Sequence, residues 1–204
     1  STILRGINYI LVPTTLLSQV DSSIGGKNGI NSIYGKNLIG TFYQPDTVLI
    51  DISFLKSLPK RELKSGYAEI IKHAIISDSN FFKWLDKNYL KIFSLDKKTI
   101  LYAIYKSIKI KSKFVTFDTK EVLKNNNSRA ILNFGHTFGH ALETFYEYKK
   151  LNHGEAIAIG MVVAAKLSKK IGYLSVNDVN KIIDHFQKVG LPVSDKSLKN
   201  KKIK

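Results

Sequence analysis

The sequence predicts an α/β segment over residues 1–60 and a mostly α-helical segment over residues 61–204. Two short apolar runs, each flanked by proline and typical of buried strands, occur only before residue 60. Beyond it, apolar residues recur at the three- and four-residue intervals of amphipathic helices. A chain of 204 residues that is 44% hydrophobic can bury a sizeable core, in one or two domains. We therefore place a domain boundary near residue 60.

The first strand is expected at residues 9–12, an apolar run that ends at Pro13. Thr14 and Thr15 follow directly. Because α/β folds commonly bind ligands where strands end, these two threonines are candidate binding residues.

Residues 16–45 are rich in glycine, with polar side chains between the glycines. Glycine lets the backbone turn tightly and approach a ligand closely. Apolar residues threaded through this segment favour a packed loop over a flexible surface loop. A second strand is expected at residues 47–52, followed by a turn through residues 57–59.

Six helices are expected after residue 60. Their predicted ranges are 61–77, 81–95, 98–117, 130–145, 155–171 and 176–189. Ser175 is expected to cap the last helix, which Gly190 ends. In the first helix, Glu69, Lys72 and His73 fall within one turn.

The formal net charge of +16 would suit a nucleic acid, an acidic membrane surface or an anionic substrate. Almost all of the 32 basic residues are lysines, and only Arg5, Arg61 and Arg129 carry the guanidinium that nucleic-acid readout favours. We therefore interpret the charge as a solvated, lysine-rich surface and expect no nucleic-acid partner. No apolar run approaches the roughly 20 residues that span a bilayer, so we expect no membrane partner either.

The sequence contains no cysteine. This excludes disulfides, thiolate metal sites and a cysteine nucleophile. It agrees with a reducing compartment, and we expect a cytoplasmic protein. Any bound metal must be held by histidine and carboxylate side chains.

Candidate metal ligands are concentrated in the helical part of the chain. They are Glu69, His73, His136, His140 and His153. Spacing alone favours the pairs His136 with His140 and Glu69 with His73, which share a helix face. A lone histidine on such a face is more often a hydrogen-bonded core residue, and His153 would equally serve as a cap or loop residue. The clustering favours a metal site, whereas a structural role is expected for His185.

An anion site would form if several basic residues converge, because each donates to phosphate or carboxylate oxygens. The candidates are Lys27, Lys36, Lys72, Lys111 and Arg129. Lys111 also fits a second interpretation, as one member of a solvated stripe with its neighbours in IKIKSKFV.

Five motifs carry a family resemblance. VPTTLLSQVDSSIGGKNGIN, YGKNLIGTFYQP, GYAEIIKH, RAILNFGHTFGHALE and HGEA, in this order and at these separations, resemble the 3-dehydroquinate synthase family over residues 3–192. The resemblance implies a remnant of a Rossmann-like NAD-binding domain followed by a mostly helical metal-binding domain. It also implies a lyase of the shikimate pathway, which converts 3-deoxy-D-arabino-heptulosonate 7-phosphate into 3-dehydroquinate and phosphate.

The resemblance also implies roles for individual residues. It makes Glu69, His136 and His153 the ligands of zinc, with cobalt as an alternative metal, and it makes His140 a catalytic residue that does not bind the metal, suited to proton transfer. Lys72 and Asp21 are further catalytic candidates. The implied NAD site consists of Thr14, Thr15, Asp21, Lys27, Lys36, Phe54, Leu55, Lys56 and Ser57. The implied substrate contacts are Lys27, Asn37, Lys72, Lys111, Arg129 and Asn133, together with Arg5 from a neighbouring subunit of a homodimer.

The sequence departs from the family pattern in three places. The glycine-rich NAD segment of the family precedes the part that begins here, and the last segment of the family follows residue 204. The connector at residues 119–128 is longer than usual, which would shift Lys111 relative to Arg129. We therefore expect the 204-residue chain to be inactive alone, and the full-length protein to be active.

Three alternatives stay open: another sugar-phosphate cyclase, a polyol dehydrogenase of the same superfamily, and an inactive gene remnant or basic binding protein. Arg129 and Asn133 suit a substrate carboxylate and its surroundings, and so favour the dehydroquinate reaction.

Overall fold

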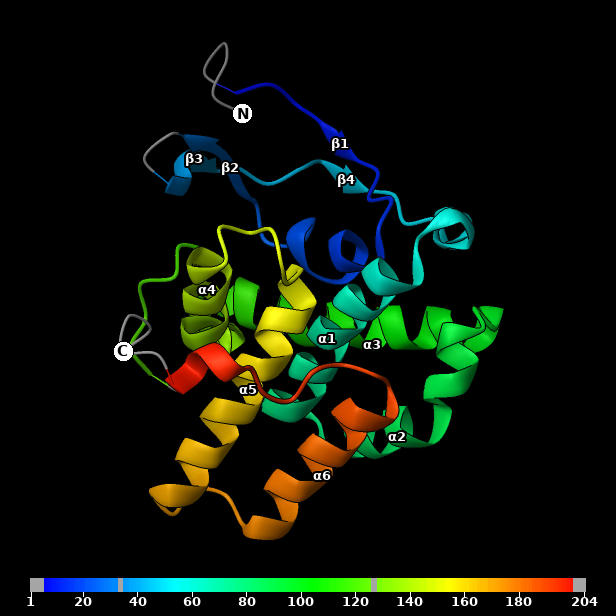
Figure 1. Ribbon diagram of the computed structural model, residues 1–204. Helices are drawn as coiled ribbons and strands as arrows, with labels where there is room; N and C mark the ends of the chain where they lie inside the picture. The colour runs from blue at the N-terminus through cyan, green and yellow to red at the C-terminus, as the bar shows by residue number, and fades with distance from the viewer. Residues whose placement is uncertain (1–5, 33–34, 126–127, 200–204) are drawn as a thin grey trace.

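The computed structural model describes residues 6–32, 35–125 and 128–199 (Figure 1). Its first strand, β1 (Ile10–Leu11), pairs in parallel with β4 (Thr47–Val48). Both lie within the ranges expected for strands, and both are shorter than predicted. After Val48 the chain leaves the sheet and forms a 3-10 helix, η3 (Ile52–Ser57), in which the Asp51 side chain accepts a hydrogen bond from the Ser53 amide.

Residues 16–45 contain regular structure that the loop prediction missed. A π-helical turn, η2 (Ser18–Ser22), is followed by an antiparallel hairpin of β2 (Lys27–Ser32) and β3 (Gly35–Phe42). Leu16 and Val20 are fully buried, as expected of a packed segment, whereas Ile30 and Ile39 of the hairpin are exposed. The segment is therefore packed at its start and solvent-facing in its hairpin.

The helical part begins at α1 (Lys60–Ser77) and continues through α2 (Ser79–Phe93) and α3 (Lys97–Phe117). Asp78 and Asp96 cap α2 and α3 by accepting from the backbone amides of Phe81 and Thr99. The later helices are α4 (His136–Phe145), α5 (His153–Lys170) and α6 (Val176–Lys188), and a 3-10 turn, η5 (Lys196–Lys199), follows. Ser175 caps α6 as predicted. In the described ranges no strand follows Val48, so the predicted change from α/β to helical structure is confirmed.

The single helix predicted at residues 130–145 is confirmed only from residue 136 onward, because Gly135 interrupts the helical path. A 3-10 turn, η4 (Arg129–Asn133), precedes the break, and α4 begins directly after it. Gly135 has a positive φ of 81°, and a Cβ there would lie 2.6 Å from the backbone nitrogen of Met161. Only glycine permits both the turn and this contact between α4 and α5.

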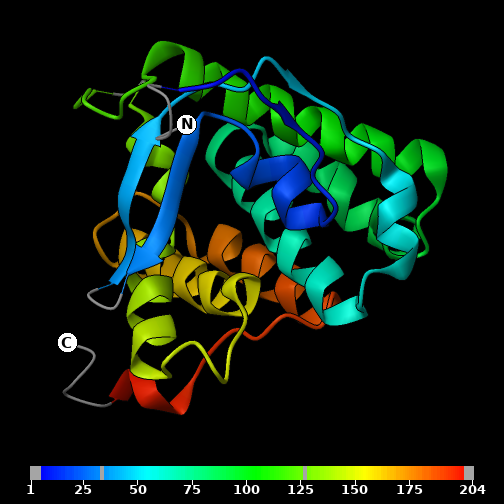
Figure 2. The same cartoon turned by 90° about the horizontal axis from the view of Figure 1, so that it is seen from above.

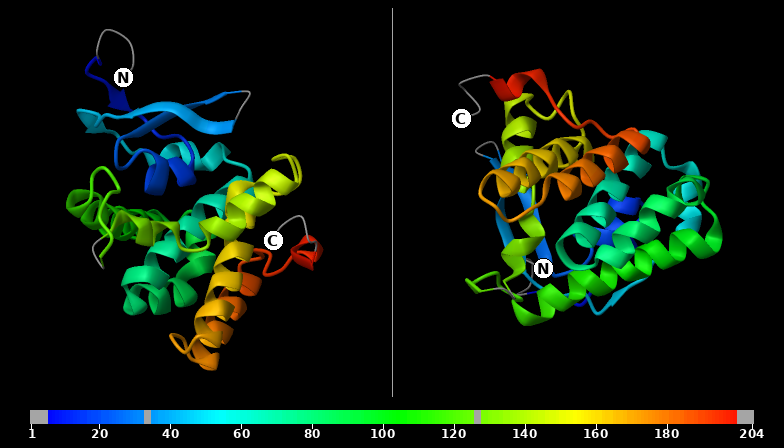
Figure 3. Two further views of the ribbon diagram at one scale, coloured as in Figure 1. Left: turned by 90° about the vertical axis from the view of Figure 1, so that its left-hand side faces the viewer. Right: turned by 90° about the horizontal axis from the view of Figure 1, so that it is seen from below.

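Helix α1 forms the centre of the molecule, with α3 on one side and α5 with α6 on the other (Figures 2 and 3). Tyr67 and Ile71 of α1 are fully buried in the same core as Leu16 and Leu55 of the strand-bearing part. The core is thus continuous across residue 60, and the division into domains at residues 1–60 and 61–204 stays a prediction. Within the described ranges, no helix combines the length and the apolar character needed to cross a lipid bilayer.

Candidate active site

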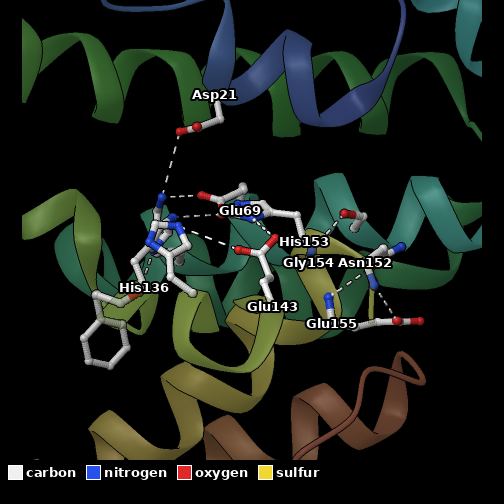
Figure 4. Close-up of polar contacts among 12 residues, drawn as sticks. Asp21, Glu69, His136, Glu143, Asn152, His153, Gly154 and Glu155 are labelled. Atoms are coloured by element: carbon white, nitrogen blue, oxygen red, sulfur yellow. Dashed lines mark hydrogen bonds and ion pairs between the residues drawn. The ribbon is translucent and has the colours of Figure 1, made fainter. Parts of the chain in front are cut away.

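Three helices bring a carboxylate and two imidazoles together. Glu69 of α1 is fully buried, and its Oε1 lies 3.6 Å from Nε2 of His136 and 3.3 Å from Nε2 of His153. Figure 4 shows these side chains pointing toward one another, with Asp21 on one side and Glu143 on the other. His140 lies one turn after His136, with ring centroids 5.2 Å apart, so the predicted shared face of these two histidines is confirmed.

The two histidines of the cluster are each the first residue of a helix. His136 follows the glycine turn at Gly135, and His153 follows Asn152, whose side chain forms a reciprocal capping box with Glu155. Such starts fix the direction of the first side chain, because the preceding residue has a defined non-helical conformation.

A close contact between α1 and α5 brings His153 to Glu69. A Cβ at Gly154 would lie 2.3 Å from the Cα of Ser65, so only glycine fits there. The Gly154 amide donates to Ser65 Oγ at 2.9 Å, which ties the start of α5 to the middle of α1. The two helices therefore approach closely at the position from which both ligands project.

The donor set fits a divalent metal. Glu69, His136 and His153 each offer a ligand atom, and these atoms lie within 4.8 Å of one another. Although buried, neither carboxylate oxygen of Glu69 has a hydrogen bond of regular geometry. Two imidazole nitrogens and one carboxylate oxygen match the three protein ligands of catalytic zinc sites, which leave a further position for water or substrate.

The charges around the cluster shift the pKa values of its members. Burial tends to raise the pKa of Glu69, but Lys72, which forms an ion pair with it, and both histidines lower it well below the usual value. Burial together with Lys72 lowers the pKa of His136 to about 4. Burial also tends to lower the pKa of His153, but the neighbouring carboxylates of Glu143 and Glu69 raise it to about 9. At neutral pH the cluster holds an ionised carboxylate, a neutral His136 and a protonated His153, which must release a proton when it binds a metal.

A second polar layer surrounds Asp21 in η2. Lys111 Nζ donates to Asp21 Oδ1 at 2.7 Å, and Lys72 Nζ lies 3.8 Å from the same oxygen. Lys111 is only 5% exposed, so its interpretation as part of a solvated stripe is wrong. His73 Nδ1 contacts Ser107 Oγ at 2.5 Å, and its Nε2 lies 3.7 Å from Asp21. The ligand atoms of Asp21, Glu69 and His73 lie within 4.8 Å of one another, so Glu69 and His73 do meet as their spacing predicts. Two ammonium groups beside Asp21 disfavour a cation at this second position.

A cavity of about 620 Å³ joins the two layers. The hairpin forms one wall, and the others are formed by η2, α1, α3, the connector, η4, α4 and the start of α5. Among the predicted site residues it is lined by Asp21, Lys27, Lys72, Lys111, Arg129, Asn133, His136, His140 and His153. The predicted convergence of basic residues therefore holds for Lys27, Lys72, Lys111 and Arg129, and the longer connector does not separate Lys111 from Arg129.

The sequence analysis missed Glu121, which lies in the connector and lines the cavity. Its carboxylate forms an ion pair with Lys27 and accepts a hydrogen bond from Asn133 Nδ2 at 2.8 Å. Arg129 is buried nearby, where its Nη1 donates to the carbonyls of Gly25 and Thr119, both at 3.0 Å. The available signal in the sequence was that Glu121 is the one acidic residue of the connector at residues 119–128, which also carries two lysines.

The second missed residue is Glu143, which is buried and faces His153 and His140. Its position seven residues after His136 places it on the ligand-bearing face of α4, and this spacing was visible in the sequence.

Of the residues implied for NAD, Asp21 and Lys27 line the cavity, whereas those that follow β1 and β4 do not. Thr14 and Thr15 follow β1, and η3, with Phe54, Leu55, Lys56 and Ser57, follows β4. Because these strands are parallel, both segments begin at the carboxyl end of the two-stranded sheet. Gln19 joins them by donating to the carbonyls of Pro13 and Asp51, at 3.3 and 2.9 Å. Leu55 is 1% exposed and lies in the core, so its side chain is not available to a ligand.

Three predicted residues cannot be placed. Arg5 lies outside the described residues, and so do the side chains of Lys36 and Asn37 in β3. His185 is buried between Tyr67 and Asp86, with contacts of 3.2 and 2.9 Å, in the structural role predicted for it.

Comparison with known proteins gives matches along the whole chain. The family model described as "3-dehydroquinate synthase N-terminal" matches residues 1–65, and that described as "3-dehydroquinate synthase C-terminal" matches residues 66–204. A 3-dehydroquinate synthase of Buchnera aphidicola subsp. Baizongia pistaciae is 47% identical over 190 residues, which cover 93% of this chain and 52% of that protein. The chain thus spans about half the length of the curated relative.

Two solved structures share the fold. ValA, a 2-epi-5-epi-valiolone synthase from Streptomyces hygroscopicus subsp. jinggangensis 5008 with NAD+ and Zn2+ bound, has a TM-score of 0.90 and 27% identity over 100% of this chain and 56% of its own. A 2-deoxy-scyllo-inosose synthase complexed with carbaglucose-6-phosphate, NAD+ and Co2+ has a TM-score of 0.76 and 29% identity over 99% of this chain and 54% of its own. These matches confirm the predicted fold class. Since the two family models together match the chain from end to end, the chain belongs to the 3-dehydroquinate synthase family.

Proposed function

We propose that the full-length protein is a 3-dehydroquinate synthase, a phosphorus–oxygen lyase that converts 3-deoxy-D-arabino-heptulosonate 7-phosphate into 3-dehydroquinate and phosphate. The observation that carries this proposal is the cavity in which the Glu69, His136 and His153 cluster lies beside a set of buried cations. A substrate with a phosphate, a carboxylate and several hydroxyl groups needs both kinds of partner.

Glu69, His136 and His153 would hold the metal, which we propose to be zinc, with cobalt as the alternative. Thr14, Thr15, Asp21, Lys27, Lys36 and the Phe54–Ser57 turn would hold NAD. When bound, the metal supplies Lewis acidity at the substrate oxygens, and the dinucleotide supplies a hydride acceptor. Support comes from the two solved relatives, which contain NAD+ together with Zn2+ or Co2+.

The basic residues of the cavity would position the substrate. Lys72, Lys111 and Arg129 carry their charges on largely buried side chains, where an anion is held more strongly than in water. Asn133 and Lys27 stand beside them on the same cavity, and Asn37 and Arg5 are proposed to complete the set. Alignment of leaving group, proton and cofactor by such contacts lowers the barrier without any covalent step.

His140 would transfer a proton to or from the substrate. Its side chain lines the cavity and is 60% exposed, so it reaches solvent as well as a bound ligand. An imidazole is suited to this role near neutral pH. Asp21, fixed by Lys111, would accept a hydrogen bond from a substrate hydroxyl and so connect the cofactor and substrate subsites.

A related sugar-phosphate cyclase activity is the second candidate, because both solved relatives act in that wider group. Arg129 and Asn133, side by side at the cavity, favour a substrate that carries a carboxylate. Assaying the full-length protein with several sugar phosphates and identifying each product would separate the two activities.

We further propose a cytoplasmic homodimer in which Arg5 reaches the phosphate subsite of the neighbouring subunit. The chain would divide into the end of an NAD-binding domain, residues 1–60, and a metal- and substrate-binding domain, residues 61–204. The junction of the two family models at residues 65 and 66 supports this division.

Two substitutions in the full-length protein test the assignment. His136→Ala should abolish zinc binding, measured by metal analysis after gel filtration, and with it the formation of 3-dehydroquinate. His140→Ala should retain zinc and lose about 100-fold to 10,000-fold in rate, the usual contribution of a positioned acid–base group. Equal loss of zinc in both variants would instead favour the pair suggested by helical spacing alone.

A further inference from the structure

Helix α4 presents three polar side chains on one face. His136, His140 and Glu143 stand at positions i, i+4 and i+7, so they project in the same direction, toward the start of α5. Glu143 is only 4% exposed. Its Oε1 lies 3.3 Å from Nδ1 of His153, and its Oε2 lies 3.9 Å from Nε2 of His140.

The ring orientation of His153 gives this contact its significance. Nε2 of His153 faces Glu69 at 3.3 Å, and Nδ1 faces Glu143 at the same distance. A histidine that binds a metal is neutral and keeps its proton on only one ring nitrogen, and the acceptor beside that nitrogen leaves the other nitrogen to the metal. An acceptor at Nδ1 therefore directs the free electron pair of Nε2 toward Glu69.

His136 is oriented in the same way by a different group. Its Nε2 lies 3.6 Å from Glu69, and its Nδ1 faces the Phe134 carbonyl at 3.3 Å. Both histidines thus present Nε2 to the same carboxylate and place Nδ1 against an oxygen acceptor. For His136 the acceptor is backbone, which substitution cannot remove, whereas for His153 it is the Glu143 side chain.

We propose that Glu143 is a positioning residue that orients His153 for metal binding and sets its tautomer, with Nδ1 protonated and Nε2 free. This inference rests on the proposed metal site of Glu69, His136 and His153. A buried carboxylate that accepts from a ligand histidine strengthens metal binding, and its loss typically costs about 10-fold to 100-fold in affinity.

The alternative role for Glu143 is that of a metal ligand. The ligand atoms of His140, Glu143 and His153 lie within 4.8 Å of one another, as those of a metal site would. In that case Glu143 would itself bind a second ion, and His153 would bridge the two ions through both of its nitrogens. The number of metal ions bound per chain distinguishes this arrangement from the positioning role.

The test compares Glu143→Gln with the wild type in the full-length protein. Glu147→Gln is the matched control, because Glu147 follows on the same segment, has a 74% exposed side chain and pairs with Lys149 at the surface. Zinc affinity is measured by competition with a chromophoric chelator, the stoichiometry by metal analysis, and the coordination geometry by the visible spectrum of the cobalt-loaded protein. Unfolding midpoints of the metal-free proteins show whether the fold is retained, and Glu143→Asp replaces Glu143→Gln if that variant does not fold.

We expect one zinc per chain in the wild type, about 10-fold to 100-fold weaker binding and an altered cobalt spectrum in Glu143→Gln, and no change in Glu147→Gln. Unchanged affinity and spectrum in Glu143→Gln would overturn the positioning role while leaving the metal site intact. Two ions per wild-type chain would overturn it in favour of a ligand role. No zinc in the wild type would refute the proposed metal site itself, and the inference with it.

Discussion

The two halves of the cavity are built differently. The metal side consists of Glu69, His136 and His153, held on three packed helices. The anion side includes Lys27 and Asn133, which lie on the hairpin and a 3-10 turn and pair with Glu121 of the connector. The Lys27 side chain is 48% exposed, whereas Glu69 is fully buried.

This difference separates two ways of building a binding site. On the metal side, caps and close helix contacts fix the donors before any ligand arrives, so a substitution there disturbs the fold as well as the site. On the anion side, Lys27, Glu121 and Asn133 are partly solvated and already pair with one another, in contrast to the buried Lys72, Lys111 and Arg129. Substitutions of the three solvated residues should change binding strength with little effect on folding, because exposed ion pairs contribute only about 0–1 kcal/mol.

The largest effect is expected for Glu69→Gln, which should abolish metal binding. It should also destabilise the protein by about 3–5 kcal/mol, because the buried Lys72 ammonium loses its nearest carboxylate and keeps only the more distant Asp21. Chemical denaturation and zinc analysis measure the two losses. Glu62→Gln, on the exposed start of the same helix, is the control and should change neither. A stable Glu69→Gln variant that keeps zinc would contradict the view that the metal side is fixed by burial.

Gly154→Ala should come next, with a loss of about 1–3 kcal/mol in the free energy of unfolding, since the added Cβ meets the Ser65 backbone at 2.3 Å. Displacement of the start of α5 would also move His153 and weaken zinc binding. Ser65→Ala removes only the hydrogen bond to the Gly154 amide and should cost less. If both variants lose the same stability, the hydrogen bond and not the close approach determines the contact.

The third prediction concerns pH. Burial, with a contribution from Lys72, lowers the pKa of His73 to about 3. The unfolded chain takes up a proton near pH 6.5, whereas folded His73 does not, so the free energy of unfolding falls as the pH decreases. Its slope is about 1.4 kcal/mol per pH unit between about pH 6.5 and pH 3.

His73→Gln in the metal-free protein should remove this contribution, as measured by denaturation at pH 5 and pH 7. Should the variant fail to fold, NMR titration of the wild-type imidazole provides the same information. A His73 signal that titrates between pH 5 and pH 8 would refute the prediction.

The smallest effect is expected on the anion side. Glu121→Gln removes the negative charge that pairs with Lys27 and Asn133 and competes with an anion for them. Inorganic phosphate should therefore bind about 2-fold to 10-fold more tightly, with little change in the free energy of unfolding. Isothermal titration at two salt concentrations measures this effect, with Glu147→Gln as a surface control. Weaker phosphate binding in Glu121→Gln would show that the connector supports the anion site instead of competing for it.

The sequence predicted the metal side better than the anion side. Helical spacing gave the face shared by His136 and His140, whereas His153 was open to interpretation as a metal ligand or as a cap or loop residue. The cluster with Glu69 depended on the family resemblance, because contacts between α1, α4 and α5 are tertiary. The interruption of the helix at Gly135 was missed because the apolar pattern continues through this residue. The positive φ of Gly135, which ends the helical path, leaves no mark in that pattern.

On the anion side, convergence depends on a hairpin and a connector, neither of which leaves a periodic signal. Lys111 was open to two interpretations, and only its burial against Asp21 decided between them. Glu121 was overlooked because an acidic residue within a polar connector is ordinarily solvated. Segments without repeating packing constraints give the least information about which side chains meet.

The motif HGEA has a physical reason at each of its four positions. His153 faces Glu69, Gly154 permits the contact with Ser65, Glu155 completes the capping box and pairs with Arg61, and Ala156 is fully buried. Because the clash at position 154 is with backbone atoms, no change of side chain at position 65 can relieve it. In an alignment of relatives, glycine should therefore be invariant at position 154 without covarying with position 65. A relative that no longer binds a metal should keep this glycine even where another residue has replaced the histidine at position 153.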